Sequence, residues 1–183
     1  MFYPYGTNDI FYKKNLKWTN KFVKENISNI EKNYNNFPSR NRWNCNCHVV
    51  HEDDTDVYPV NYLFLKKEYE KLSKTVCKKF KIKDYHLSDI WYNYYKQDQY
   101  QEPHTHAGQG GLTAVHYLMF NPDYHSVTHF TNKQIKSPKI KQGDILFFPA
   151  NIEHFVPKNK TDEPRLTVAF TITKRRTYEF QKK

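Results

Sequence analysis

The chain has 183 residues and a formal net charge of +10, with 29 Lys and Arg residues against 19 Asp and Glu residues. This length predicts a single domain that can bury a core without disulfide bonds. The sequence has no run of about 18 apolar residues and no signal-peptide pattern after Met1, so we expect neither a membrane span nor secretion.

The first half of the chain is predicted to form two helices that support a sheet. Apolar residues recur at helical spacing over residues 19–34, where Thr19 can act as the N-cap, and again over residues 60–80. Both segments carry charged residues on the opposite side. Each helix is therefore expected to pack one face against a sheet.

A segment with cysteines and histidines lies between the two predicted helices. Cys45, Cys47, His48 and His51 are residue types that bind zinc, but the thiols lack the usual two-residue spacing and no second pair follows. Residues 43–50 are also typical of a strand in which Cys45 and Cys47 share one face. We favour the strand over a zinc site. The odd number of cysteines indicates a reducing compartment, the cytoplasm.

From Tyr85 onward the pattern changes to short strands. Strands are predicted at residues 90–95, 113–120, 126–130, 144–148, 165–173 and 177–180. Many short strands with Gly and Pro turns are typical of an antiparallel barrel or a double-sheet jelly roll. The chain is therefore predicted to be a single α+β domain. Residues 1–84 would form a helical support, and residues 85–183 would form the jelly-roll core.

Three histidines are the strongest candidates for a functional site. His104 and His106 are two residues apart, so an extended backbone points both side chains the same way. His154 follows an apolar strand, and a jelly roll can bring these points together. Imidazole is the commonest side-chain ligand of first-row metal ions. We therefore predict one metal ion bound by the three histidines, against the alternative that they are ordinary loop histidines.

The motifs of the second half come in a characteristic order. They are residues 91–95, the run Glu102-Pro103-His104-Thr105-His106, residues 115–118, residues 143–149, His154, and residues 165–170. This order resembles that of the 2-oxoglutarate/Fe(II)-dependent oxygenases. It is most similar to their prolyl-4-hydroxylase-like group and to small phage and bacterial members with a His-Thr-His motif. The resemblance covers about half of the chain and implies a double-stranded β-helix with the N-terminal helices packed on one face.

The resemblance also implies roles for individual residues. His104 would be the first iron ligand and His154 the distal one. Arg165 would pair with the 5-carboxylate of 2-oxoglutarate, for which a planar guanidinium is well suited. Tyr117 matches a strand tyrosine that helps to hold the same carboxylate, and Thr167 shares the strand face of Arg165 and can add a hydroxyl donor.

Three further residues are candidates for the lining of the pocket. Tyr94 or Tyr95 is placed near the iron by the resemblance. His116 alternates with Ala114 and Leu118 along a predicted strand. It is therefore expected to be a packed or pocket-rim residue rather than a metal ligand.

His106 departs from the family pattern, which has Asp or Glu at this position. Three interpretations follow: His106 binds the metal as a third imidazole, it turns away and leaves two protein ligands, or the site is degraded. We favour binding, because the His-Thr-His pattern is a feature of a group within the family.

The sequence thus predicts an Fe(II)- and 2-oxoglutarate-dependent dioxygenase that hydroxylates an unactivated C–H bond. Family analogy alone suggests a protein side chain such as proline; a nucleobase and a small molecule remain open. The expected location is the cytoplasm, which is the cytoplasm of the host cell if a phage encodes the protein. One alternative is a three-histidine, cupin-like dioxygenase that does not use 2-oxoglutarate. The other is a basic, metal-free nucleic-acid-binding module, but the lysines are scattered along the chain, which favours a solvated surface.

Overall fold

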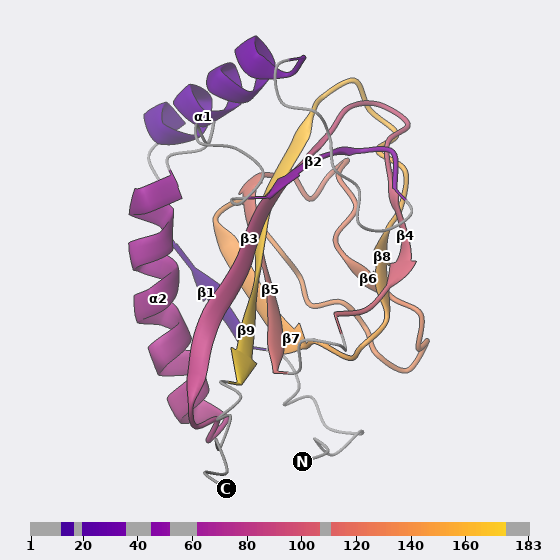
Figure 1. Ribbon diagram of the computed structural model, residues 1–183. Coiled ribbons are helices and arrows are strands. Elements are labelled where there is room, and N and C mark those ends of the chain that lie inside the picture. The colour runs from indigo at the N-terminus through magenta and orange to yellow at the C-terminus, as the bar shows by residue number, and fades with distance from the viewer. Residues whose placement is uncertain (1–11, 17–19, 36–44, 52–61, 107–110, 175–183) are drawn as a thin grey trace, which may run out of the picture.

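The structure, a computed structural model, describes residues 12–16, 20–35, 45–51, 62–106 and 111–174. Two antiparallel sheets face each other, and helices cover the outer face of the larger sheet (Figure 1). The α+β jelly roll predicted from the sequence is therefore confirmed.

The larger sheet has six strands in the order β1-β7-β5-β9-β3-β2. Each neighbouring pair is antiparallel. β5 and β7 are buried along nearly their whole length, because other layers cover both faces of the sheet. The strands in chain order are Tyr12–Asn15 (β1), His48–His51 (β2), Tyr85–Tyr95 (β3), Leu112–Met119 (β5), Asp144–Pro149 (β7) and Arg165–Lys174 (β9).

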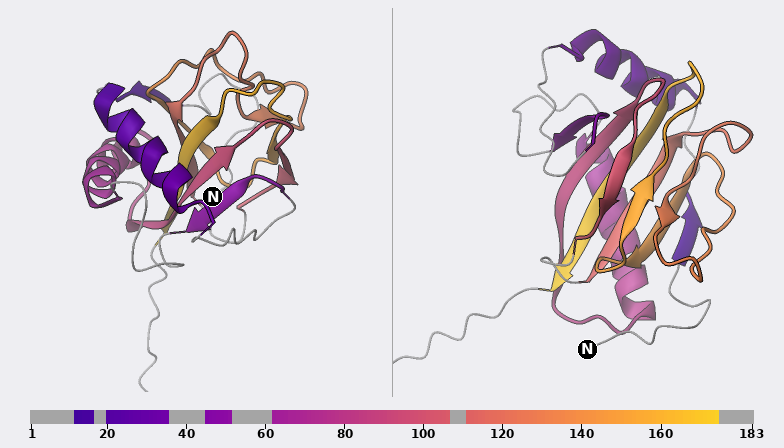
Figure 2. Two further views of the ribbon diagram at one scale, coloured as in Figure 1. Left: turned by 90° about the horizontal axis from the view of Figure 1, so that it is seen from above. Right: turned by 90° about the vertical axis from the view of Figure 1, so that its right-hand side faces the viewer.

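The smaller sheet has three short strands in the order β4-β8-β6. They are Gln101–His104 (β4), His154–Val156 (β8) and His129–Phe130 (β6). Figures 1 and 2 show this sheet on the side of the larger sheet that faces away from the helices. Apolar side chains of the two sheets meet in a shared core, which includes Trp91, Val115, Phe148 and Val156.

The two helices are α1, Asn20–Asn33, and α2, Tyr62–Lys79. α2 buries Leu65, Tyr69, Leu72 and Val76, which follow one another at helical spacing, against the larger sheet. Both helices were predicted, although the proposed N-cap Thr19 lies outside the described residues. No helix within the described ranges is long and apolar enough to cross a membrane.

Gly143 makes the turn into β7 and has a positive φ of 82°. A Cβ atom at this position would lie 2.8 Å from the carbonyl oxygen of Leu16, so a larger residue would collide with the backbone. The Gly143 N–H donates to the carbonyl of Tyr117 at 2.8 Å, and its carbonyl accepts from the Leu16 N–H at 2.8 Å. This turn therefore ties β7 to its neighbours in the sheet.

The strands differ from the predicted ones in several places. The strand predicted at 90–95 begins five residues earlier as β3, and only His129–Phe130 of the predicted 126–130 is a strand. β1, β4 and β8 were not predicted, because each has at most four residues. The segment predicted as a strand at 43–50 forms β2 at its end, and residues 177–180 lie outside the described part. The first half thus contributes two strands as well as two helices.

Candidate metal and oxo-acid site

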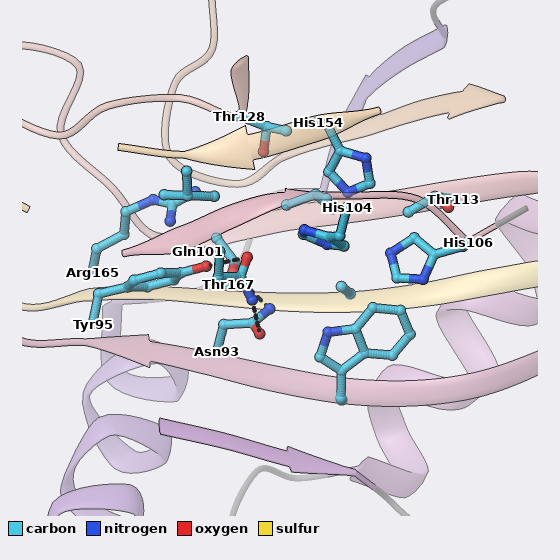
Figure 3. A pocket seen from close by; sticks show the side chains of 14 residues that line it. Asn93, Tyr95, Gln101, His104, His106, Thr113, Thr128, His154, Arg165 and Thr167 are labelled. Atoms are coloured by element: carbon cyan, nitrogen blue, oxygen red, sulfur yellow. Dashed lines mark hydrogen bonds between the residues drawn. The ribbon is translucent and has the colours of Figure 1, made fainter. Parts of the chain in front are cut away.

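His104 and His154 face each other across two neighbouring strands. They are directly paired in the antiparallel ladder of β4 and β8, so their side chains leave the smaller sheet on the same face. Their ring centroids are 4.4 Å apart. The ladder therefore fixes two imidazoles side by side (Figure 3).

His106 completes the cluster from the segment just after β4. Its backbone N–H donates to the carbonyl of Ala150 at 2.8 Å, which anchors this segment beside the turn between β7 and β8. Its ring centroid lies 5.2 Å from that of His104 and 5.4 Å from that of His154. One nitrogen from each ring can be chosen so that all three lie within 4.8 Å of one another. The three histidines predicted from the sequence are thus brought together.

Hydrogen bonds set the tautomer of two of these rings. Nδ1 of His104 lies 2.8 Å from the carbonyl oxygen of Glu102, and Nδ1 of His154 lies 2.9 Å from that of Ile152. A carbonyl can only accept, so Nδ1 carries the proton in both rings and Nε2 keeps its lone pair. A metal-binding histidine is commonly held in this way by a backbone carbonyl.

The His154 residue is buried and His104 and His106 are half-buried, and burial makes the charged form of each ring unfavourable. Burial, together with the neighbouring His104 and His51 rings, lowers the pKa of His106 to about 3. Burial also lowers the pKa of His104 and takes that of His154 well below its usual range. The rings are therefore neutral near pH 7, which is the form that binds metal.

Arg165, the first residue of β9, is only 2% exposed. None of its three guanidinium nitrogens has a hydrogen-bonding partner among the described residues. Its Cζ lies 4.6 Å from the ring centroid of Tyr95 and 5.5 Å from that of Tyr117. A buried cation without a counter-ion is costly, so this position fits an anionic ligand, and a carboxylate matches the planar donor fork.

Arg165 and the three histidines line the same pocket between the two sheets (Figure 3). Its walls contain no carboxylate side chain among the described residues. The apolar part of the wall comes from Trp91, Val115, Val156 and Ala169. The pocket thus offers neutral metal ligands near one end and an unpaired cation near the other.

A row of buried polar side chains runs along the wall of this pocket. The Tyr95 hydroxyl donates to Oε1 of Gln101 at 2.8 Å, and Nε2 of Gln101 donates to Oδ1 of Asn93 at 2.9 Å. Nδ2 of Asn93 donates to Oγ1 of Thr167 at 3.4 Å. Asn93 and Gln101 were not predicted as site residues. Their only signal in the sequence is that Asn93 and Tyr95 share a strand face, two residues apart.

The structure places Tyr117 and Thr167 on the pocket side of the sheet. Thr167 lines the pocket beside Arg165. The Tyr117 hydroxyl donates to Oγ1 of Thr128 at 2.9 Å and accepts from the Thr128 N–H at 3.2 Å. Thr128, which was not predicted, lines the pocket, and the Tyr117 hydroxyl lies behind it as its hydrogen-bonding partner.

Two residues proposed for the pocket lie on the other face of the larger sheet. The Tyr94 hydroxyl donates to Oε1 of Glu31 on α1 at 2.6 Å, so this side chain points toward the helices. His116 is fully buried, and its Nδ1 lies 2.9 Å from the Tyr69 hydroxyl of α2. Of the two tyrosines proposed for the lining, Tyr95 is therefore in the pocket and Tyr94 is not, because alternate residues of a strand point to opposite faces. His116 is a packed residue, as one of the two expectations for it held, and not a residue of the pocket rim.

The arrangement of β2 separates the two histidines that were weighed as part of a zinc site. His48 packs edge-on against Tyr34 with the ring centroids 4.2 Å apart, whereas His51 stacks on Trp91 at 5.4 Å. The two histidines are therefore on different sides of the larger sheet. Within the described residues, the metal-binding cluster found is that of His104, His106 and His154.

Comparisons with known proteins agree with the motif order. Residues 119–171, which include His154 and Arg165, match the model of a family described as "Putative 2OG-Fe(II) oxygenase". A comparison with curated proteins gives no match. This match supports the 2-oxoglutarate/Fe(II) oxygenase classification predicted from the sequence, and the likeness to solved structures shows the fold.

Several solved structures share the fold. A prolyl-4-hydroxylase from Pseudomonas putida superimposes with a TM-score of 0.68 at 10% identity, covering 92% of this chain and 94% of that one. A viral collagen prolyl hydroxylase from Paramecium Bursaria Chlorella virus-1, solved with 2-oxoglutarate, gives 0.66 at 16% identity over 92% and 98%. HygX from Streptomyces hygroscopicus, solved with nickel and 2-oxoglutarate, gives 0.59 at 13% identity over 90% and 83%.

Proposed function

We propose that this chain, which has the fold of the 2-oxoglutarate/Fe(II) oxygenases and matches a family model of that class, hydroxylates an unactivated C–H bond. The observation that carries the proposal is the unpaired guanidinium of Arg165 in the same pocket as three neutral imidazoles. A dicarboxylate that also binds a metal ion would satisfy both features at once. 2-Oxoglutarate is such a molecule.

His104, His106 and His154 would hold the metal ion. Each ring is neutral and offers one nitrogen, so the set suits Fe(II) as well as other first-row ions. Three protein ligands leave positions for the oxo acid and for dioxygen. His106 replaces a carboxylate and removes one negative charge from the ligand set, so the ion keeps more of its positive charge toward the oxo acid.

Arg165 would hold the far carboxylate of the oxo acid. Its five N–H donors lie in a plane that matches a carboxylate, and no protein acceptor among the described residues competes for its nitrogens. The hydroxyls of Thr128 and Thr167 line the same part of the pocket and can donate to the second oxygen. The Tyr95 ring covers the guanidinium and keeps water away from it.

When bound, Fe(II) and 2-oxoglutarate supply the oxidation: dioxygen converts the oxo acid to succinate and carbon dioxide, and one oxygen atom enters a substrate C–H bond. The residues of the chain orient the reactants and exclude water. Trp91, Val115, Val156 and Ala169 form dry walls around the reacting centre. Among substrates, we propose a protein side chain such as proline as the first to test, because two solved structures with this fold are prolyl hydroxylases.

An anaerobic titration tests this function without knowledge of the substrate. Fe(II) followed by 2-oxoglutarate is expected to give a visible charge-transfer band in the wild type. Arg165→Met should bind Fe(II) with unchanged affinity and need a much higher 2-oxoglutarate concentration for the same band. His86→Ala, a change at an exposed histidine of β3, is the matched control and should titrate as the wild type does. A folded wild type without the band would overturn the proposal.

The three-histidine ligand set also favours a second candidate, a cupin-like dioxygenase that binds its substrate directly on the metal. This candidate gives Arg165 no role in the reaction. It would be preferred if Arg165→Met and the wild type bound metal equally and 2-oxoglutarate changed the metal spectrum of neither.

A further inference from the structure

The outer side of α2 carries a stripe of lysines. Lys67, Lys71, Lys74 and Lys78 follow one another at intervals of four, three and four residues, so they lie along one side of the helix. All four are exposed, and 73% of the Lys71 side chain is accessible. The stripe is opposite the residues that α2 buries against the larger sheet. The lysines scattered in the sequence are thus aligned in space.

The charge on this helix is one-sided. Residues 62–83 contain eight lysines and two glutamates, a large part of the chain's net charge of +10. Oε1 of Glu68 pairs with Nζ of Lys71 at 2.6 Å. The first turn of α2 has no acidic residue, although a helix N-terminus favours negative charge. Lys78 and Lys79 suit the C-terminal end of the helix, but the lysines nearer its start gain nothing from the helix dipole.

The stripe costs the helix some stability. Lysines at i and i+4, such as Lys74 with Lys78, repel each other by roughly 0.2–0.5 kcal/mol per pair. A solvated surface usually mixes both signs of charge, which avoids this repulsion. A polyanion lying along the stripe would remove it.

We propose that the outer side of α2 is a binding surface for the phosphate backbone of nucleic acid. Lysine is a common partner of phosphate, whereas interfaces between proteins are depleted in it. A membrane-surface helix needs apolar residues that can enter the lipid, but Leu65, Tyr69 and Val76 of α2 are buried in the core. The chemistry of the stripe therefore fits a nucleic acid better than an acidic protein or a bilayer.

This surface is separate from the pocket. α2 covers one face of the larger sheet, and the pocket lies on the opposite face, toward β4 and β8 (Figures 1 and 2). The part of a nucleic-acid strand that contacts the lysines of α2 would therefore lie away from the pocket. The surface localises the protein on nucleic acid and does not select the reacting group.

Fluorescence anisotropy with the full chain and short labelled oligonucleotides of mixed sequence tests the proposal. Single-stranded DNA, duplex DNA and single-stranded RNA are titrated from about 50 to about 200 mM salt. The test variant changes Lys67, Lys71, Lys74 and Lys78 to Gln, a residue with nearly the same helix propensity as Lys. The control variant changes Lys133, Lys136, Lys139 and Lys141 to Gln. These four are exposed residues between β6 and β7, so both variants lose the same charge.

The α2 variant should lose at least about tenfold in affinity at low salt, and its slope of log affinity against log salt should fall by about 3 to 4. The control should stay close to the wild type. Circular dichroism and metal binding at the histidine cluster verify that both variants are folded.

Three outcomes would overturn the proposal. The first is a wild type that binds none of the three oligonucleotides at low salt. The second is an equal loss of affinity in the two variants, since net charge alone would then explain binding. The third is displacement of the oligonucleotide by poly-glutamate or by phosphatidylserine vesicles as effectively as by unlabelled oligonucleotide of the same charge, which would assign the stripe to an acidic protein or to a membrane.

Discussion

The two faces of the larger sheet both bury polar side chains, but they differ in whether those side chains have hydrogen-bonding partners. On the helix-covered face, His116 lies against the Tyr69 hydroxyl and Tyr94 donates to Glu31. On the pocket face, Arg165 is buried to the same degree, yet its three nitrogens have no partner among the described residues. A buried polar group with a partner fixes the packing of layers. A buried cation without one indicates a ligand that supplies the missing charge.

The largest expected effect separates a histidine of the pocket, His104, from one on the helix-covered face, His116. His104→Ala removes one of three metal ligands and should weaken Ni(II) or anaerobic Fe(II) binding by more than about 100-fold, since even residues that only support a ligand change affinity by 10- to 100-fold. His116→Gln should bind metal as the wild type does. Isothermal titration calorimetry measures both. Equal losses in the two variants would mean that the cluster of His104 is not the metal site.

Arg165→Met should have effects of opposite sign on binding and on stability. Loss of the charged donor is expected to weaken 2-oxoglutarate binding to the metal-loaded protein by about 2 kcal/mol, roughly 30-fold. The ligand-free protein should unfold at a higher temperature, because a buried charge without a partner is removed. Calorimetric titration and thermal melts measure the two effects. A variant that is less stable and binds 2-oxoglutarate normally would make Arg165 a structural residue.

His116, on the helix-covered face, should make the stability of the fold depend on pH. Burial lowers the pKa of His116 to about 3, while the unfolded chain has a value near 6.5. Between these values the unfolded state binds the extra proton, so stability is lost as the pH falls below about 6.5. At pH 5.5 the expected loss from this residue is about 1 kcal/mol relative to pH 7.5.

Urea denaturation of the wild type and of His116→Gln at the two pH values isolates this contribution. The amide of Gln can still meet the Tyr69 hydroxyl but does not titrate, so the variant should lose less stability in acid. Identical losses in both proteins would assign the acid sensitivity to other groups.

The smallest expected effect compares two adjacent tyrosines. Tyr94→Phe removes a partly buried hydrogen bond to a carboxylate and should lower the free energy of unfolding by about 1 kcal/mol without changing 2-oxoglutarate affinity. Tyr95→Phe removes the hydroxyl that donates to Oε1 of Gln101 in the pocket wall. It should weaken 2-oxoglutarate binding by a few-fold. If Tyr94→Phe weakened 2-oxoglutarate binding and Tyr95→Phe affected only stability, the assignment of Tyr94 to the helix-covered face and of Tyr95 to the pocket face would be contradicted.

The same pair explains where prediction from sequence failed. Residues of β3 from Ile90 to Tyr95 are buried without interruption, because helices cover one face and the smaller sheet covers the other. In a strand with one solvated face, polar and apolar residues alternate, and this alternation identifies the buried face. A strand buried on both faces has no such alternation. The sequence could thus name Tyr94 and Tyr95 as candidates without choosing between them. The register shift between Ser88 and Ile90 adds to the ambiguity.

Asn93 and Gln101 were missed for a related reason. Their contact joins β3 to the start of β4, and neither residue has a spacing that predicts it. The short strands β4 and β8 were also missed, although their pairing brings His104 opposite His154. Strands of three or four residues carry too little pattern to be recognised, since their stability comes from the layers around them.

The amino-acid sequence by itself determined the two helices, most of the longer strands, the jelly-roll class and the set formed by His104, His106, His154 and Arg165. These follow from local periodicity and from residue chemistry in a recognisable order. Only the tertiary structure decided which side chains share the pocket, that Arg165 lacks a partner among the described residues, and that four lysines of α2 form one stripe. Such properties depend on how strands pair and which layer covers each face, and these are set by contacts between residues far apart in the chain.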